Sequence, residues 1–291
     1  APPGMRFLRR PPARRLCSSA SPPLTWERIA SKDPKPGALP LLLVPGFACG
    51  IAEWTVLPRR LARTSRRDVI AFDHRGIGGS PAPAGPYSIP MLARDALAVM
   101  DSAGVDRAAV LGISMGGMVA QEMAITAPAR VSGLVLGCTM HGGKEAHPPP
   151  ASFFETCSGL ADGEPAATDA FLRAMLPPSA LEGPAGERLL AQFHASFVQQ
   201  RRDAEGLRGQ LAAMMRFNST KRLGSLGDCP TLVVTGSDDV VVPPANAASI
   251  AEKVPGAELL TWPDAGHFWW QHRTVEVCER IARFLLERCD R

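Results

Sequence analysis

Short apolar runs recur along the chain and alternate with stretches whose apolar residues repeat at helical spacing. A run of four to eight apolar residues that ends at a turn signal is typical of a buried strand. Such strands alternating with helices predict an α/β fold, a mostly parallel sheet flanked by helices. The expected strands are 39–44, 68–72, 108–113, 131–137, 231–235 and 258–262, and the expected helices are 53–63, 88–103, 115–127, 244–254 and 273–288.

The alternation stops between about residues 140 and 226. This stretch has no strand-like run; it begins with the loop-forming sequence HGGKEAHPPP and continues as helical segments rich in Phe and Met. It follows the strand after the 115–127 helix, so it is expected to cover the C-terminal edge of the sheet, where open α/β sheets bind ligands. We therefore expect a helical cap at 140–226 and a core built from 25–139 and 227–291.

The first 24 residues differ in composition from the rest of the 291-residue chain. They contain five arginines and no acidic residue, while the net charge of the whole chain is +4. Nucleic-acid-binding proteins spread basic residues over a folded face, so no nucleic-acid partner is expected. An Arg-, Ser- and Ala-rich segment without acids is typical of a transit peptide, which implies a mitochondrion or plastid. Its proline pairs also suit a disordered basic tail, which leaves a cytoplasmic protein.

Two further features bear on membrane insertion and on the redox state of the cysteines. The longest stretch of low charge, 108–125, contains a serine, a glutamine, a glutamate and three glycines, so no integral membrane segment is expected. The seven cysteines are odd in number and lack the paired spacing of a zinc site. We expect reduced, buried thiols, with Cys49 set apart because it lies near an expected active-site loop.

Residues 112–116 read Gly-Ile-Ser-Met-Gly and fit G-x-S-x-G between an expected strand and an expected helix. A nucleophile on so sharp a turn has strained dihedral angles, and the residues two before and two after it must be small. Ser114 is therefore the candidate nucleophile.

A serine hydroxyl needs a base within hydrogen-bond reach and a third group that orients the base. His267 is the best base, because it lies in a loop directly after the last expected strand. Asp238 and Asp239 both follow the preceding strand. We favour Asp239 for its spacing to Pro243, while Asp238 suits a turn-capping role. The chain order Ser, Asp, His is the one expected for a nucleophile elbow of this kind.

Four motifs in order resemble the α/β-hydrolase superfamily, in its capped serine esterase and lactonase-like branch. They are Val44-Pro45-Gly46-Phe47, Asp73-His74-Arg75-Gly76-Ile77-Gly78-Gly79-Ser80, the Ser114 elbow, and the Asp239 and His267 pair. The resemblance covers about residues 38–289. It implies an oxyanion hole made by the backbone N–H groups of Phe47 and Met115.

The chain departs from the family pattern at two places. Pro45 stands where the family usually has a histidine, so the bracing of that loop must differ. The region before residue 39 is short, with 25–30 its one good strand candidate, so the N-terminal hairpin is expected to be reduced. His74 belongs to a structural motif of the family and is not assigned to catalysis. His141 and His147 lie near the expected cap entrance, where contact with substrate and a solvated loop position are both open.

These residues predict a serine hydrolase that cleaves carboxylic esters, lactones or thioesters through an acyl-enzyme. The apolar cap favours a small to medium hydrophobic acyl substrate. No cofactor and no metal are expected. The alternatives are cofactor-free perhydrolase or lyase chemistry with the same triad, and a slow-turnover ligand receptor on the same scaffold, since fold alone does not settle function.

Overall fold

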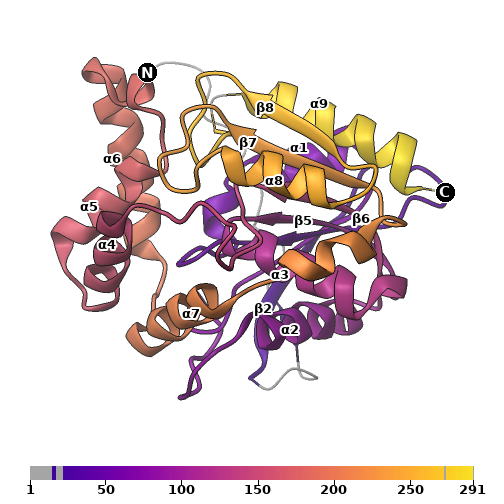
Figure 1. Cartoon of the computed structure of the whole chain (residues 1–291), viewed down its shortest axis with the longest axis horizontal. Coiled ribbons are helices and arrows are strands. Elements are labelled where there is room, and N and C mark those ends of the chain that lie inside the picture. The colour runs from indigo at the N-terminus through magenta and orange to yellow at the C-terminus, as the bar shows by residue number, and fades with distance from the viewer. Residues whose placement is uncertain (1–14, 18–21, 272, 291) are drawn as a thin grey trace, which may run out of the picture.

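A computed structural model describes residues 15–17, 22–271 and 273–290 of the chain. Eight strands form one sheet in the order β1-β2-β4-β3-β5-β6-β7-β8 (Figure 1). β1 and β2 are antiparallel to their neighbours, and all later pairings are parallel. The strands are β1 (Arg15–Cys17), β2 (Leu24–Ile29), β3 (Leu41–Val44), β4 (Val69–Phe72), β5 (Ala108–Ile113), β6 (Val131–Gly137), β7 (Thr231–Gly236) and β8 (Glu258–Trp262). The expected mostly parallel α/β sheet is confirmed.

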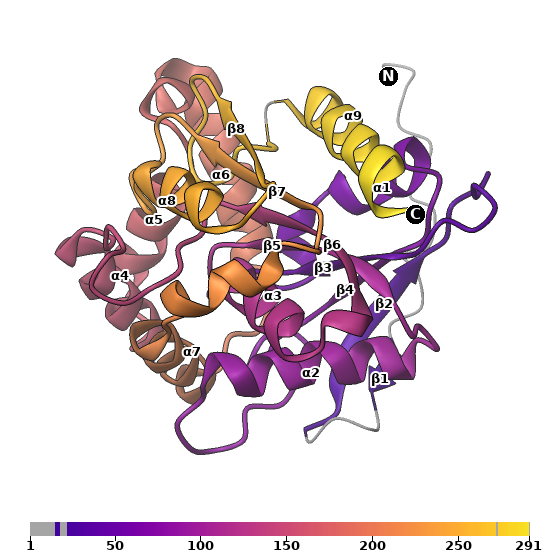
Figure 2. The same ribbon diagram turned by 45° about the vertical axis from the view of Figure 1, so that its right-hand side comes forward.

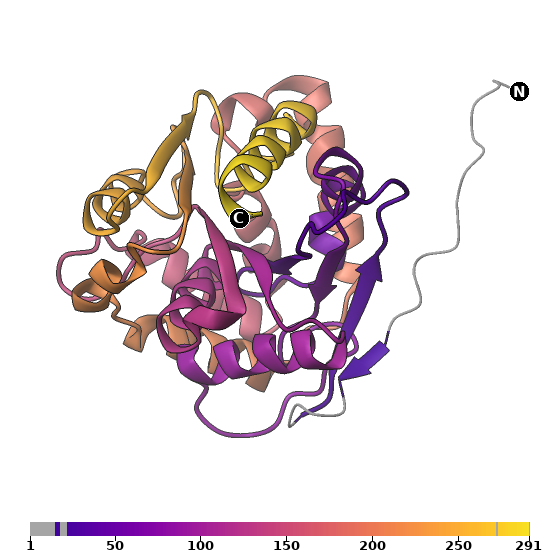
Figure 3. The same cartoon turned by 90° about the vertical axis from the view of Figure 1, so that its right-hand side faces the viewer.

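Helices cover both faces of the sheet. Figures 2 and 3 show α1 (Leu57–Thr64) and α9 (Thr274–Phe284) together on one face. The other face carries α2 (Ile89–Ser102), α3 (Met115–Thr126) and α8 (Ala245–Lys253). Every residue of β3 to β7 is buried, as expected of strands covered on both sides.

The helix expected at 53–63 starts later than predicted. A 3-10 turn, η1 (Ala52–Trp54), comes first, and α1 begins at Leu57. Thr55 has a φ of +52°, which no α-helical residue adopts. Pro58 then occupies the first turn of α1, where its missing N–H costs nothing. At the other end of the chain, α9 stops at Phe284 and is continued by a π-helical turn, η5 (Leu285–Cys289).

The N-terminal region takes part in the sheet earlier than the sequence indicated. β1 lies within the tail assigned to 1–24, and β2 begins one residue before the expected core boundary. The transit-peptide prediction falls mainly on residues 1–14 and 18–21, which lie outside the described residues. The antiparallel pair of β1 and β2 is short, with three paired positions.

A helical insertion, which we define as residues 140–226, separates β6 from β7. It contains α4 (Ala151–Ala161), α5 (Pro165–Ala174), η3 (Pro178–Leu181), α6 (Gly183–Gln199), α7 (Ala204–Arg216) and η4 (Thr220–Leu226). Figure 1 shows α4 to α7 grouped at one side of the sheet. Among the described helices, none has both the length and the apolar character needed to cross a membrane.

Candidate active site

Ser114 lies on the sharp turn between β5 and α3. Its backbone has φ +56° and ψ −121°, a strained conformation of the kind that nucleophile elbows adopt. The Ser114 N–H donates to the carbonyl of Gly137 at 2.9 Å, and the Ser114 carbonyl accepts the Thr139 hydroxyl at 2.7 Å. The end of β6 and the loop after it therefore hold the turn in place.

Two glycines allow this turn to form. A Cβ on Gly112 would lie 2.2 Å from the carbonyl oxygen of Gly116, and a Cβ on Gly116 would lie 2.1 Å from that of Val44. A side chain at either position would collide with backbone, which cannot yield easily. This is the physical reason for the G-x-S-x-G spacing. Gly117 lets α3 approach the loop after β6, because a Cβ there would lie 2.5 Å from the side chain of Thr139.

The loops after β7 and β8 are tied to each other. The N–H groups of Ser237 and Asp238 donate to the carbonyls of Trp262 and Ala265, each at 2.9 Å. Residues 28 positions apart in the chain are thereby brought to the same edge of the sheet. The carboxyl ends of parallel strands meet at such an edge, so this is where ligands of open α/β sheets bind.

The structure brings Asp239 and His267 into contact at this edge. His267 Nδ1 and Asp239 Oδ2 are 2.8 Å apart, and both residues are buried. The other carboxylate oxygen of Asp239 accepts the N–H groups of Val241 and Val242 at 2.8 and 2.9 Å. Asp238 instead is half-buried and accepts a hydroxyl from the preceding serine. Of the two aspartates, Asp239 is the one that bonds His267.

A partly enclosed cavity has both Ser114 and His267 in its wall. Most of the other lining side chains are aromatic or apolar. They come from the loop after β3, from η1, from the end of β5, from the helical insertion and from the loop after β8: Pro45, Phe47, Cys49, Glu53, Trp54, Ile113, Phe153, Phe171, Met175, Met214, Phe268 and Trp270, with Gly46 and Gly50. Such an apolar pocket with a few polar groups is typical of a small-molecule site.

Two backbone amides near Ser114 have no acceptor. Within the part of the chain that the structure describes, the N–H groups of Phe47 and Met115 donate no hydrogen bond. Phe47 follows Gly46, where a Cβ would lie 3.2 Å from the Ser114 Cβ, so this loop passes directly beside the serine. Met115 is the first residue of α3, and the first N–H groups of a helix have no partner inside the helix. Free donors at such a place can stabilise a developing oxyanion.

His74 braces the loop that carries Pro45. Its ring is fully buried, and Nε2 lies 3.1 Å from the Pro45 carbonyl oxygen. A carbonyl only accepts, so Nε2 carries the proton. Burial, reinforced by the charge of Arg75 and opposed by the bond to Pro45, lowers the pKa of His74 to about 4. His74 is therefore neutral at pH 7. It bonds the loop through the Pro45 carbonyl and does not line the cavity.

The two histidines left open in the insertion do not line the cavity. His141 is fully buried, and its ring bonds Gly142, Thr220 and Ser249 at 2.8 to 3.0 Å. His147 is exposed, and its backbone bonds the side chain of Asn246. The structure places both in the attachment of the insertion to the core.

A buried polar cluster beside the cavity had no counterpart in the sequence patterns. Arg202 and Glu53 form an ion pair at 2.5 Å, and each side chain is 8% exposed. Burial raises the pKa of Glu53, and the charge of Arg202 opposes this rise. The two residues are 149 positions apart, and the sequence predicts Glu53 only as the first residue of a helix. No local periodicity could have paired them.

Two buried cysteines lie near the site: Cys49 lines the cavity, and Cys138 lies beside Asp239 and His267. The six cysteines whose side chains the structure describes are free thiols. Burial and the charge of Glu53 raise the pKa of Cys49 well above its usual value, so this lining thiol stays protonated.

One set of side chains in the described part of the chain has donors close enough for a metal ion. Cys138, Asp239 and His267 offer donor atoms within 4.8 Å of one another. Burial and the charge of Asp239 raise the pKa of Cys138 well above its usual value. Asp239 and His267 already bond each other at 2.8 Å, so two of these three donors serve that contact.

The sequence pattern of the family described as alpha/beta hydrolase fold matches residues 40–269. The poly(3-hydroxyalkanoate) depolymerase of Ectopseudomonas oleovorans is 31% identical over 264 residues, which is 91% of this chain and 90% of that protein. A protein of Azorhizobium caulinodans that carries the provisional name carbamate hydrolase RutD is 31% identical over 226 residues, 76% of this chain and 81% of its own length.

A solved structure agrees over nearly the whole fold. The crystal structure of an enol-lactonase from Burkholderia xenovorans LB400 matches with a TM-score of 0.79 and 25% identity, covering 91% of this chain and 97% of that one. The family match spans most of the strands and helices described above, together with the elbow and the loops that follow β7 and β8. The chain therefore belongs to the α/β-hydrolase fold family and is a hydrolase.

Proposed function

We propose that the protein is a serine hydrolase that cleaves carboxylic esters, lactones or thioesters of small to medium hydrophobic acyl groups. Ser114 is the nucleophile, His267 its base and Asp239 the group that orients the base. The N–H groups of Phe47 and Met115 form the oxyanion hole, and the helical insertion acts as a cap.

One observation carries this proposal. His267 Nδ1 is bonded to Asp239 at 2.8 Å, while the same imidazole lines the cavity that Ser114 lines. The bond leaves Nε2 as the nitrogen free to accept a proton, and a buried carboxylate beside Nδ1 stabilises the imidazolium that forms. The strained turn of Ser114 and the two unbonded amides beside it support the same assignment.

The reaction follows from these positions. His267 Nε2 takes the hydroxyl proton as Ser114 Oγ attacks the substrate carbonyl, and the amides of Phe47 and Met115 stabilise the negative oxygen. His267 then gives its proton to the leaving group as the bond to the carbonyl carbon breaks. In the second half, His267 removes a proton from water, which attacks the acyl-enzyme and releases the acid and free Ser114.

The cavity supports the substrate class. Its aromatic and methionine lining favours burial of apolar acyl groups. Glu53 is its one acidic lining residue, and both oxygens of Glu53 are bonded, to Arg202 and to the N–H of Gly50. The names of two of the relatives, a polyester depolymerase and an enol-lactonase, agree with an acyl-oxygen bond as the target.

The first test replaces the nucleophile. In Ser114→Ala, turnover of a p-nitrophenyl ester should fall by a factor on the order of 10⁶, and a fluorophosphonate probe should no longer label the protein. An unchanged rate would rule out the mechanism. Esters of increasing chain length, lactones and acyl-thioesters, assayed side by side, then identify the leaving group.

A pair of adjacent aspartates gives a matched control for the acid. Asp239→Asn should lower kcat by about 10⁴-fold, because the amide stabilises the wrong tautomer of His267. Asp238→Asn should leave kcat unchanged, because among the described residues that carboxylate bonds the adjacent Ser237 and not His267. Equal loss in both variants would contradict the assignment. A single burst without further turnover in the wild type would favour the ligand receptor instead of the enzyme.

A further inference from the structure

Ala48 follows the expected oxyanion donor Phe47 and has an unusual backbone. Its φ is +59°, a left-handed conformation that costs free energy for any residue with a Cβ. The residue is fully buried in the loop after β3. The direction of the Phe47 N–H depends on the conformation of this loop, so what holds Ala48 also holds the donor.

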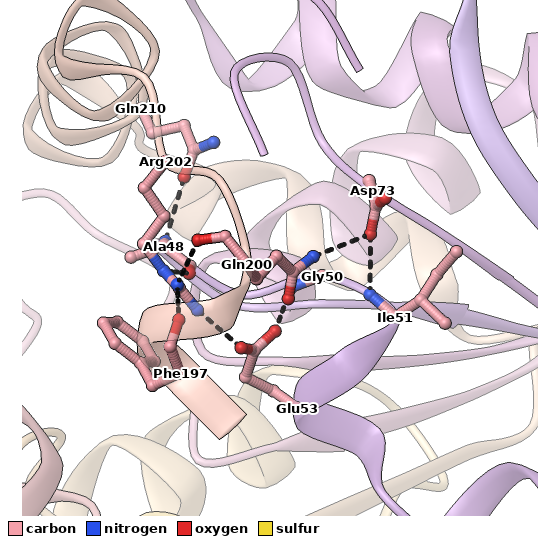
Figure 4. Close-up of polar contacts among 9 residues, drawn as sticks. All are labelled: Ala48, Gly50, Ile51, Glu53, Asp73, Phe197, Gln200, Arg202 and Gln210. Carbon is pink, nitrogen blue, oxygen red and sulfur yellow. Dashed lines mark hydrogen bonds and ion pairs between the residues drawn. The ribbon is translucent and has the colours of Figure 1, made fainter. Parts of the chain in front are cut away.

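Both backbone polar groups of Ala48 are bonded by side chains of the helical insertion (Figure 4). The Ala48 N–H donates to Gln210 Oε1 at 3.1 Å, and the Ala48 carbonyl accepts from Arg202 Nε at 2.8 Å. Gln210 lies on α7 and Arg202 just before it. The core supplies the strained residue, and the insertion supplies both of its partners.

These two partners are themselves held rigidly. Gln210 is fully buried, and its Nε2 donates to the Arg75 carbonyl at 2.9 Å. The Arg202 guanidinium bonds Glu53 at 2.5 Å and the carbonyls of Phe197 and Gln200, and it lies over the Phe197 ring. The fork of an arginine can make several directed bonds at once, which a lysine cannot.

The next residues of the loop are held in the same way. The Gly50 N–H donates to Glu53 at 2.7 Å, and the Ile51 N–H donates to Asp73 Oδ1 at 2.8 Å (Figure 4). Gln200 of the insertion also donates to Asp73 Oδ1, at 3.1 Å. Space here is tight, since a Cβ on Gly50 would lie 2.3 Å from Asp73. Glu53 thus links the loop to Arg202, because one of its carboxylate oxygens accepts from the Gly50 N–H and the other from the Arg202 guanidinium.

We propose that Arg202 and Gln210 are positioning residues of the oxyanion hole, which hold Ala48 left-handed so that the Phe47 N–H faces the substrate carbonyl oxygen. Glu53 acts through Arg202. The helical insertion is then a working part of the catalytic site and more than a cover over the pocket. This inference rests on the proposed serine hydrolase function.

The main test removes both charges of the ion pair, so that neither is left buried alone. In Glu53→Gln/Arg202→Met, kcat for p-nitrophenyl butyrate should fall roughly 10²-fold through misplacement of the donor, with KM changed by less than about threefold. The inhibition constant of a trifluoromethyl ketone, whose adduct with Ser114 carries an oxyanion, should rise by the same factor as kcat falls. If the ion pair served stability alone, the folded variant would keep the wild-type kcat and the wild-type inhibition constant.

Two milder variants carry the test if the double variant does not fold. Gln210→Leu should also lower kcat. Arg202→Lys should retain part of the wild-type kcat, because lysine keeps the charge but lacks the several directed donors of the guanidinium. Arg201→Met is the matched control, since Arg201 is exposed and its side chain pairs with Asp203 at the surface. It should behave as the wild type.

The outcomes separate this inference from the proposed function. If the wild type shows no turnover that depends on Ser114, the proposed function fails. If the wild type turns over and the folded Gln210→Leu and Arg202→Lys variants match it in kcat and in affinity for the ketone, the positioning role is wrong. Thermal melting of each variant establishes that it is folded at the assay temperature.

Discussion

Single residues at this site have strained backbone conformations that neighbouring residues must hold. Ser114 and Ala48, both at positive φ, lie on facing loops, so the site is built around strained backbone that its surroundings must hold. His74 performs that task under Pro45, the position at which the chain departs from the pattern it resembles. His74 Nε2 bonds the Pro45 carbonyl at 3.1 Å, so a buried neutral imidazole braces this loop.

The buried His74 makes stability depend on pH. Its pKa is about 4 in the folded protein against an ordinary value of 6.5, so the unfolded chain binds the proton first as pH falls. Stability is therefore lost between about pH 6.5 and pH 4, by about 3 kcal/mol. In His74→Gln, which keeps a donor for Pro45, this part of the loss should disappear. Urea unfolding at several pH values measures it, and an unchanged pH slope would contradict the prediction.

At the scale of elements, the strand-turn-helix unit of β5 and α3 fixes the position of Ser114. Its closeness to β3 permits no side chain at Gly116. Gly116→Ala would place a Cβ 2.1 Å from the Val44 carbonyl oxygen and 2.5 Å from that of Pro45, so one backbone segment must shift. The cost should exceed the 1–3 kcal/mol that overpacking typically causes, because backbone rather than side chain is struck.

Gly224 offers the control for this substitution. It lies in η4 with an ordinary φ and open space around its Cα. Gly224→Ala should change the free energy of unfolding by no more than about 0.5 kcal/mol. Chemical denaturation of the two variants gives the comparison, and similar values for both would refute the explanation of the elbow spacing.

At the scale of the whole molecule, the cavity belongs to no single element. The loop after β3, η1, the insertion and the loop after β8 each supply part of its wall. The insertion is joined to the last loop by the Phe268 N–H, which donates to the Met175 carbonyl at 2.8 Å. Under the proposed function, acyl-chain preference should therefore depend on how the insertion packs on the core.

Two adjacent methionines of α7 test this view. Met214 lines the cavity, whereas Met215 is 69% exposed outside it. Met214→Ala should shift the preferred p-nitrophenyl ester towards a longer acyl chain, with kcat/KM ratios changed by about 10-fold or more, the usual worth of a methylene in an apolar pocket. Met215→Ala should leave the preference unchanged. Equal profiles for both variants and the wild type would show that the acyl group binds elsewhere.

Much of the sheet was readable from the sequence, because buried parallel strands are local apolar runs. The bounds of β5, β6 and β8 match the expected ones, and those of β2, β3, β4 and β7 differ by one or two residues at one or both ends. β1 was missed because Arg15–Cys17 has no apolar run; it pairs with the edge of β2, and the Arg15 guanidinium lies over the Trp26 ring. An edge strand of this kind is decided by its partner.

The sequence by itself determined the α/β class, the elbow at Ser114 and the order of the candidate Ser, Asp and His, since each depends on local spacing and on the ends of strands. It favoured Asp239 over Asp238 only by its spacing to Pro243, and the tertiary structure shows the bond between Asp239 and His267. Only the tertiary structure brought Glu53, Arg202 and Gln210 to Ala48. The reason is physical: contacts between residues some 150 positions apart depend on how the insertion packs on the core, and no local pattern records that.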